Sequence, residues 1–115
     1  MSEHSHGKVV LDDVIPLGRA LRPLIPDVYR GYAELNTAAM KAGAVDAKTK
    51  ELIALAVSVT LRCDGCINAH TDAAIKAGAT KEEVVDALGV AIMVNAGAAM
   101  VYSARTVDAF DAKSG

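Results

Sequence analysis

The sequence predicts an all-α protein, a compact bundle of five to six helices in a single domain of residues 1–115. Of these residues, 52% are hydrophobic and 22 are alanine, the residue with the highest helix propensity. No sustained period-two alternation is bounded by turn pairs such as Asn-Gly, and the β-branched residues lie inside alanine-rich segments. A chain of this length folds around one hydrophobic core.

Proline and glycine positions define the first two expected helices. The first covers Val14 to Arg22 and ends at the proline-containing segment that follows, Pro23 to Pro26. The second begins at Pro26, because proline suits the first turn of a helix. It ends at Gly43, because glycine suits the left-handed conformation that follows a helix.

Three further helices are expected to begin after Gly43. Asp46 caps the first of them, whose interior, residues 52–59, is apolar on nearly every side, as expected of a helix surrounded by others. The next helix begins near Asp64 and ends at Gly78. The sequence Thr80-Lys81-Glu82-Glu83 has the Ser/Thr-x-x-Glu form of a capping box and marks the start of a fifth helix.

The segment from Ala87 to Ala104 contains no charged residue. Its 18 positions reach the lower length limit of a membrane span, about 17 to 25 residues. Alanine and glycine contribute little to membrane insertion, so we expect no membrane span here. Asn95-Ala96-Gly97 is instead expected to break the segment into two helices, each burying a face within the chain or against a neighbouring subunit.

The charge balance and the amino-terminal residues exclude several classes of protein. The chain has 12 basic and 14 acidic residues, a net charge of -2 and no run of Lys or Arg, so neither nucleic acid nor an anionic membrane is an expected partner. Residues 1–10 contain no apolar stretch followed by a small-residue cleavage site. We therefore expect a flexible tail and a cytoplasmic protein. No phosphate-binding glycine loop or nucleotide fingerprint occurs, and no cofactor is expected.

The apolar residues are mostly small, since the chain has no tryptophan and one phenylalanine. Small residues let helices approach one another closely. A short chain can hardly hide so large an apolar fraction by itself. Identical neighbours are therefore expected to cover the excess in a closed, symmetric homo-oligomer.

The stretch Cys63-Asp64-Gly65-Cys66-Ile67-Asn68-Ala69-His70 contains both cysteines of the chain. In the cytoplasm such a pair is kept reduced, so it indicates redox chemistry, catalysis or metal binding rather than a structural disulfide. At about 100° per residue, Cys63, Cys66 and His70 fall within about 60° on one helix face. Cys66 lies near a helix start, where free N–H groups and the helix dipole stabilise a thiolate. His70 can accept the proton of the Cys66 thiol, and Cys63 can close a disulfide with Cys66.

Glu51 and Ser58 are the candidate residues that support His70. If the helices on either side of residues 62–65 form an antiparallel hairpin, Glu51 lies nearer the level of His70 than of Cys66, at about 1.5 Å rise per residue. A carboxylate there orients the imidazole and sets its tautomer, directly or through a water. Ser58 lies on the same side of its helix as Glu51 and can add a hydroxyl group to this network.

The same residues are compatible with three further roles. The cysteines can simply be small buried hydrophobes. Cys63, Cys66, His70 and an acid can supply four zinc ligands, although all of them would crowd one turn and its neighbour, without the usual distant second pair. Glu51 and His70 alone can perform cofactor-free acid/base chemistry on a small carboxylated ring, in which case the cysteines are dispensable.

The motifs Glu51-Leu52-Ile53-Ala54-Leu55-Ala56-Val57-Ser58, Cys63-Asp64-Gly65-Cys66, His70 and Gly78-Ala79-Thr80-Lys81-Glu82-Glu83 follow one another in a familiar order. This order resembles the carboxymuconolactone decarboxylase superfamily, specifically its alkylhydroperoxidase AhpD-like branch. The similarity runs from about Tyr29 to Tyr102. The combined spacing of the acid, the serine, the cysteine pair and the histidine is far more specific than the Cys-x-x-Cys motif alone.

The resemblance implies a compact all-helical fold that assembles as trimers or hexamers, and a thiol-dependent peroxidase or disulfide reductase activity. It implies that Cys66 attacks a hydroperoxide, that Cys63 closes the disulfide, and that His70 and Glu51 relay the proton. It also implies re-reduction by a dithiol protein of the dihydrolipoyl type. The position before the second cysteine, a histidine in the peroxidase of that branch, is Gly65 here. The decarboxylases of the superfamily lack the cysteine pair, which argues against lactone decarboxylation.

Overall fold

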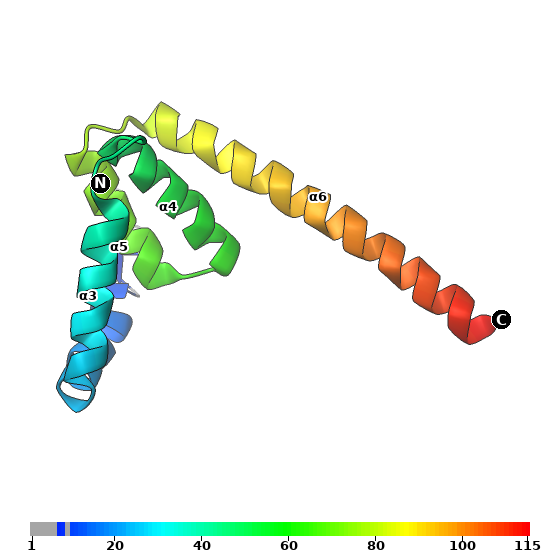
Figure 1. The fold of residues 1–115 in the computed structure, drawn as a ribbon, viewed down its shortest axis with the longest axis horizontal. Coiled ribbons are helices and arrows are strands. Elements are labelled where there is room, and N and C mark those ends of the chain that lie inside the picture. The colour runs from blue at the N-terminus through cyan, green and yellow to red at the C-terminus, as the bar shows by residue number, and fades with distance from the viewer. Residues whose placement is uncertain (1–6, 9) are drawn as a thin grey trace.

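The computed structural model describes residues 7, 8 and 10–115, and this part of the chain consists of helices and short connections, without strands (Figure 1). The all-α prediction is therefore confirmed. The described elements are η1 (Val10–Val14, a π-helix), α2 (Ile15–Leu21), η2 (Arg22–Leu24, a 3-10 helix), α3 (Pro26–Met40), α4 (Ala47–Leu61), α5 (Asp64–Lys76) and α6 (Lys81–Ser114).

The caps expected from the sequence begin α4 and α6. Asp46 Oδ1 accepts a hydrogen bond from the N–H of Thr49 at 2.7 Å. The Thr80 hydroxyl accepts from the N–H of Glu83 at 3.1 Å, and the Glu83 carboxylate accepts from the N–H of Thr80 at 2.9 Å, which completes the capping box. The chain leaves α5 through Gly78, whose φ of 88° is easy only for glycine. These local predictions are confirmed because each depends on neighbouring residues alone.

The break expected at Asn95-Ala96-Gly97 is wrong, because α6 continues without interruption for 34 residues. A glycine costs about 1 kcal/mol in a helix interior, but the alanines around Gly97 are the strongest helix formers. Asn95 is also held by the helix, since its Nδ2 donates to Ala91 O at 2.7 Å and to Thr60 Oγ1 of α4 at 3.0 Å. Its amide therefore serves the contact between α4 and α6 rather than a turn.

α4 and α5 form a helical hairpin, and the first half of α6 packs beside α4 (Figure 1). The contacts between α4 and α6 run in the same order along both helices, from Lys48 with Glu83 to Thr60 with Asn95. The two helices are therefore parallel. The buried residues of these three helices are Leu55, Ser58, Ala74 and Ala91. Beyond Asn95, α6 leaves the other helices and projects as an arm (Figure 1).

The single chain is not the compact bundle expected from the sequence. Its radius of gyration is 18.5 Å, whereas a compact domain of this length has a value of about 13 Å. The physical cause is the uninterrupted α6, because without a break near Gly97 its second half cannot fold back onto α4. Large exposed apolar side chains occur on all five α-helices, among them Leu17, Leu35, Ile53, Ile75, Met100 and Val101.

Among the described residues, α6 is the one helix that is long and apolar enough to cross a membrane by length and composition. Of its most apolar 18-residue window, 6% is buried inside the chain.

The segment expected to form a flexible tail, residues 1–10, falls largely outside the described residues, which omit 1–6 and 9. Val10 is described and is fully buried at the start of η1. Since η1 contacts α5 as well as α2, the described end of this segment packs against the helix that carries Cys66 and His70.

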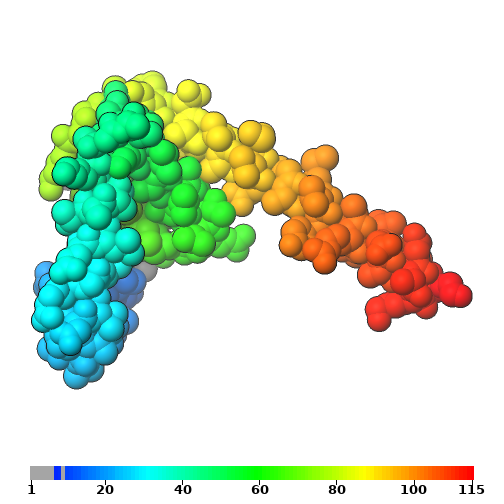
Figure 2. Space-filling model, in the orientation of Figure 1, coloured from blue at the N-terminus to red at the C-terminus, as the bar shows by residue number. Residues whose placement is uncertain are grey.

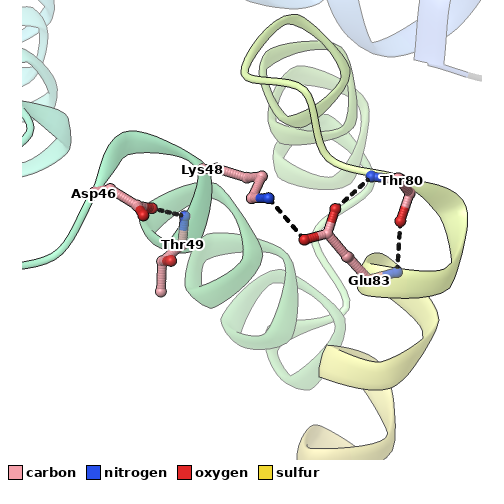
Figure 3. A network of polar contacts seen from close by, with 5 residues as sticks. All are labelled: Asp46, Lys48, Thr49, Thr80 and Glu83. Atoms are coloured by element: carbon pink, nitrogen blue, oxygen red, sulfur yellow. Dashed lines mark hydrogen bonds and ion pairs between the residues drawn. The ribbon is translucent and has the colours of Figure 1, made fainter.

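A polar network joins the start of α4 to the start of α6 (Figure 3). Lys48 Nζ donates to Glu83 Oε2 at 2.7 Å, while the other carboxylate oxygen of Glu83 accepts from the N–H of Thr80. Two hydrogen bonds hold the pKa of Glu83 below its ordinary value. The larger effect comes from Lys48 and the next from the backbone N–H of Thr80. Lys50 also fixes α4, since its Nζ donates to two carbonyls at the end of α3 at 2.8 and 2.6 Å.

Replacing Glu83 by glutamine is expected to lower the Tm at neutral pH and to have no effect on it in acid. Glutamine can still accept from the N–H of Thr80, so the change removes mainly the charge that pairs with Lys48. Because the pKa of Glu83 is depressed on folding, its contribution is present above the ordinary value of 4.5 and is lost as the pH falls through the lower folded value. Thermal unfolding followed by circular dichroism at several pH values checks this.

The control for this prediction is Glu82→Gln, which removes a carboxylate from the same helical turn without touching the bonds to Lys48 and Thr80. We expect a smaller loss of Tm at neutral pH in this control. A Tm difference between the parent and Glu83→Gln that stays constant down to about pH 3 would contradict the assignment.

Candidate functional site

The turn between α4 and α5 places both cysteines at the start of a helix. Arg62 adopts the left-handed conformation, with φ 54° and ψ 48°, and reverses the chain direction at the end of α4. Cys63 follows in an extended conformation, and its N–H donates to Ser58 O at 3.1 Å. Cys63 is therefore the N-cap residue of α5, and Cys66 lies in the first turn of that helix.

The two cysteines are joined by a disulfide, with Sγ atoms 2.09 Å apart, so the structure represents the oxidised form. The N–H of Cys66 also donates to Cys63 Sγ at 3.1 Å. From the sequence we expect the free N–H groups of the helix start to stabilise a thiolate on Cys66. In the structure the N–H of Cys66 instead points at the sulfur of Cys63. Asp64, an acidic residue in the first turn of α5, agrees with a helix that starts directly after Cys63.

Glu51 on α4 and His70 on α5 are in direct contact. Glu51 Oε2 lies 2.8 Å from His70 Nδ1, and because a carboxylate only accepts, the imidazole donates from Nδ1. This bond leaves the lone pair of neutral imidazole on Nε2, the nitrogen that can act as a base. The side chains of His70 and Glu51 are 21% and 12% exposed, so the pair is largely shielded from water.

Ser58 takes a different place from the one expected. The residue is 3% exposed, and its hydroxyl group donates to Ala54 O at 2.6 Å, one turn back along α4. Its carbonyl accepts the N–H of Cys63. The hydrogen bonds of Ser58 therefore support α4 and the turn that positions Cys63, and not the imidazole of His70.

The α4–α5 hairpin thus brings the cysteine pair and the His70–Glu51 pair onto neighbouring parts of one site. Cys66 and His70 are four residues apart on α5 and project from the same face of that helix. A Cβ atom at Gly65 would meet no atom within 4 Å, so the position beside Cys66 is open. Within residues 7, 8 and 10–115, no group of three or more His, Cys, Asp or Glu side chains is arranged to hold a metal ion.

The fold and the site together define a class of protein: a small all-α subunit with a Cys-x-x-Cys pair at a helix start and a carboxylate-bound histidine one turn later. The chain belongs to the carboxymuconolactone decarboxylase family, whose model matches residues 26–109. The superfamily prediction made from the sequence is confirmed.

Individual relatives cover most of the chain. An uncharacterized protein from Haemophilus influenzae is 50% identical over 85 residues, which cover 74% of this chain and 75% of the relative. The solved apo structure of a carboxymuconolactone decarboxylase family protein from Legionella pneumophila is 36% identical, with a TM-score of 0.72, over 95% of this chain and 96% of its own. A family member from Thermotoga maritima, with a suggested involvement in the antioxidative response, is 35% identical with a TM-score of 0.55 over 70% of this chain and 82% of its own.

Proposed function

We propose that this protein is an antioxidant enzyme, a thiol-dependent peroxidase or disulfide reductase whose redox centre is the Cys63–Cys66 pair. The observation that carries the proposal is a disulfide at the start of α5, one turn from a histidine whose Nδ1 is held by Glu51 at 2.8 Å. Membership of the family and the antioxidative role suggested for the Thermotoga maritima relative support the same class of chemistry.

The first half of the proposed reaction oxidises Cys66. His70 Nε2 takes the proton of the Cys66 thiol, and the thiolate attacks one oxygen of a hydroperoxide. The O–O bond breaks, the leaving alkoxide receives the proton from His70, and the products are an alcohol and a sulfenic acid on Cys66. Glu51 keeps the imidazole in the correct tautomer and stabilises its protonated form.

The second half closes and reopens the disulfide. The sulfur of Cys63 attacks the sulfenic sulfur of Cys66, the S–O bond breaks, and water leaves. A dithiol reductant, such as a dihydrolipoyl-type protein, then attacks Cys66, and Cys63 leaves as a thiolate. The N–H directed at Cys63 Sγ makes it the better leaving group. The second thiol of the reductant releases Cys66 and carries away the oxidising equivalents as its own disulfide.

Mass spectrometry after one equivalent of hydroperoxide tests this proposal. The reduced protein should lose two hydrogen atoms, and neither cysteine should then react with an alkylating reagent, because both sulfurs lie in the 63–66 disulfide. Opening that disulfide with a monothiol and alkylating at once should leave the monothiol on Cys66 and the alkyl group on Cys63. Unconsumed peroxide with both cysteines still alkylated would refute the peroxidase.

A second candidate is cofactor-free acid/base catalysis on a small carboxylated ring, as the family name suggests. The 2.8 Å pair of His70 and Glu51 is a complete acid/base device without the cysteines. Turnover of a carboxylated lactone that survives replacement of both cysteines by serine would favour this activity over the redox one.

A further inference from the structure

Arg62, at the turn between α4 and α5, has a backbone conformation that arginine rarely adopts. Its φ of 54° and ψ of 48° lie in the left-handed region, and among the described residues it is the one non-glycine residue with a positive φ. A Cβ atom makes this region unfavourable, so such positions are usually occupied by glycine. The left-handed position between α5 and α6 follows this rule, since it is Gly78. The turn before Cys63 therefore keeps a side chain at position 62 at the cost of backbone strain.

The side chain of Arg62 contributes no bond to the fold. The turn is held by backbone atoms, since the N–H of Arg62 donates to Val59 O at 3.2 Å and the N–H of Cys63 donates to Ser58 O at 3.1 Å. Arg62 is exposed. Within the described part of the chain, its guanidinium takes part in no hydrogen bond, ion pair or ring contact. Its N–H donors are therefore available to a group from outside the chain.

The position of Arg62 places a positive charge beside the disulfide. Arg62 directly precedes Cys63, and adjacent Cα atoms are about 3.8 Å apart. A molecule that contacts the disulfide is therefore within reach of the long Arg62 side chain. The space beside Cys66 is open, because a Cβ atom at Gly65 would meet no atom within 4 Å. Figure 2 shows the end of the α4–α5 hairpin, coloured green, at the edge of the molecule.

Few other charges lie near this turn. Between residues 52 and 71, Arg62 and Asp64 are the only formally charged side chains, and Asp64 is not free. The nearest acid before this segment, Glu51, is bound to His70 at 2.8 Å. The guanidinium of Arg62 is therefore the one unpaired cation of the hairpin turn, and it favours an anion among the molecules that approach the disulfide.

We propose that Arg62 selects the reductant of the disulfide by binding a carboxylate that the reductant carries near its dithiol. This inference rests on the proposed redox function of the Cys63–Cys66 pair. A guanidinium matches the geometry of a carboxylate and can bind both of its oxygens. The reductant is favoured over the hydroperoxide as the molecule recognised, because it must displace Cys63, the direct neighbour of Arg62.

The reaction that Arg62 assists is the reopening of the disulfide. A thiolate of the reductant attacks Cys66 Sγ, the S–S bond breaks, and its electron pair moves to Cys63 Sγ. The second thiol of the reductant loses its proton, attacks the mixed disulfide and releases Cys66 as a thiolate. The reductant becomes a disulfide, and the two cysteines receive its two electrons and, on protonation, two protons.

The test starts from the oxidised protein and contains no hydroperoxide. Dihydrolipoate and dihydrolipoamide have the same dithiol and differ in one carboxylate, so the ratio of their rates of disulfide reduction isolates the effect of that charge. At low ionic strength, dihydrolipoate is expected to reduce the parent about two to five times faster, the range of one exposed ion pair. Added salt should abolish this preference. Arg62→Gln should remove it and Arg62→Glu should invert it.

Two further variants separate recognition from structure and from net charge. Arg62→Gly should keep or raise the Tm, because glycine adopts a φ of 54° easily, and it should also remove the preference for dihydrolipoate. A side chain that holds the turn would give a lower Tm. Lys41→Gln removes an exposed cation at the end of α3, which lies by the start of α4, and should retain the parent's ratio.

Peptides that carry dihydrolipoyl-lysine between aspartates or between asparagines separate two sources of the carboxylate. A preference for the aspartate peptide supports an acidic segment of a protein reductant, and a preference for dihydrolipoate alone supports a small molecule. Equal rates for acidic and neutral probes, an unchanged ratio in Arg62→Gln, an equal effect of Lys41→Gln, or a lower Tm in Arg62→Gly would overturn the role of Arg62 and leave the redox function intact. A disulfide that none of these dithiols reduces would overturn the redox function as well.

Discussion

Replacing Cys66 by serine is expected to lower kcat/KM for hydroperoxide reduction by at least about a thousandfold. The serine hydroxyl is nearly isosteric with the thiol, but at neutral pH it is not ionised and cannot form a sulfenic acid or a disulfide. The loss therefore reports the chemistry of the sulfur and not a change in packing. Peroxide consumption measured with a dithiol donor in excess checks this result.

The matched control for that experiment is Cys63→Ser. Serine is a preferred N-cap residue, so the start of α5 should be preserved. This variant should still consume one equivalent of peroxide per chain and then stop, leaving a sulfenic acid on Cys66 that dimedone can trap. If Cys66→Ser turns over peroxide at the parent's rate, or if Cys63→Ser alone loses the first equivalent, the assigned roles are wrong.

Replacing His70 by alanine should lower kcat/KM about a hundredfold to a thousandfold, the range of a lost general acid–base. Glu51→Gln should cost less, about tenfold, because glutamine keeps the contact with the imidazole but does not stabilise its protonated form. Glu51 acts through His70 in this scheme. The double variant should therefore be no slower than His70→Ala by itself. Steady-state rates of the three variants provide the measurement.

An exposed carboxylate on α3 provides the control for the charge change. Glu34→Gln should retain the parent's rate, which excludes a general effect of net charge on peroxide binding. Multiplicative losses in the double variant would mean that Glu51 contributes independently of the imidazole, and the proposed relay would then be incorrect.

The starts of α4 and α6 could be predicted well because neighbouring residues decide them. The end of α3 was predicted incorrectly, since the helix ends at Met40 and Gly43 does not adopt the left-handed conformation expected of it. Asp46, Thr80 and Glu83 satisfy helix-start N–H groups within three residues, so the sequence pattern and the structure agree. The break at residues 95–97 was predicted incorrectly because the same asparagine can end a helix or bond across to another one. The partner that decides between these outcomes, Thr60, is 35 positions away in the chain.

In the candidate site, too, some features follow from neighbouring residues and others depend on residues far apart in the sequence. The spacing of Cys63, Cys66 and His70 on α5 follows from helix geometry alone. The contact between Glu51 and His70, which are 19 residues apart, depends on how α4 and α5 pack and could be stated only for an assumed hairpin. Which sulfur receives the helix-start N–H was also undecided, because the first residue of a helix is uncertain by about one or two positions and a shift of that size changes the capping residue.

The sequence by itself determined the helical class, the caps, and the placement of two thiols and an imidazole along one helix, since these depend on interactions within one or two turns. Tertiary structure alone decided that α6 stays straight and that Glu51 meets His70 directly. It also decided that so much apolar surface stays uncovered in a single chain. These outcomes arise from contacts between segments distant in the sequence, whose free energies depend on three-dimensional packing rather than on local pattern.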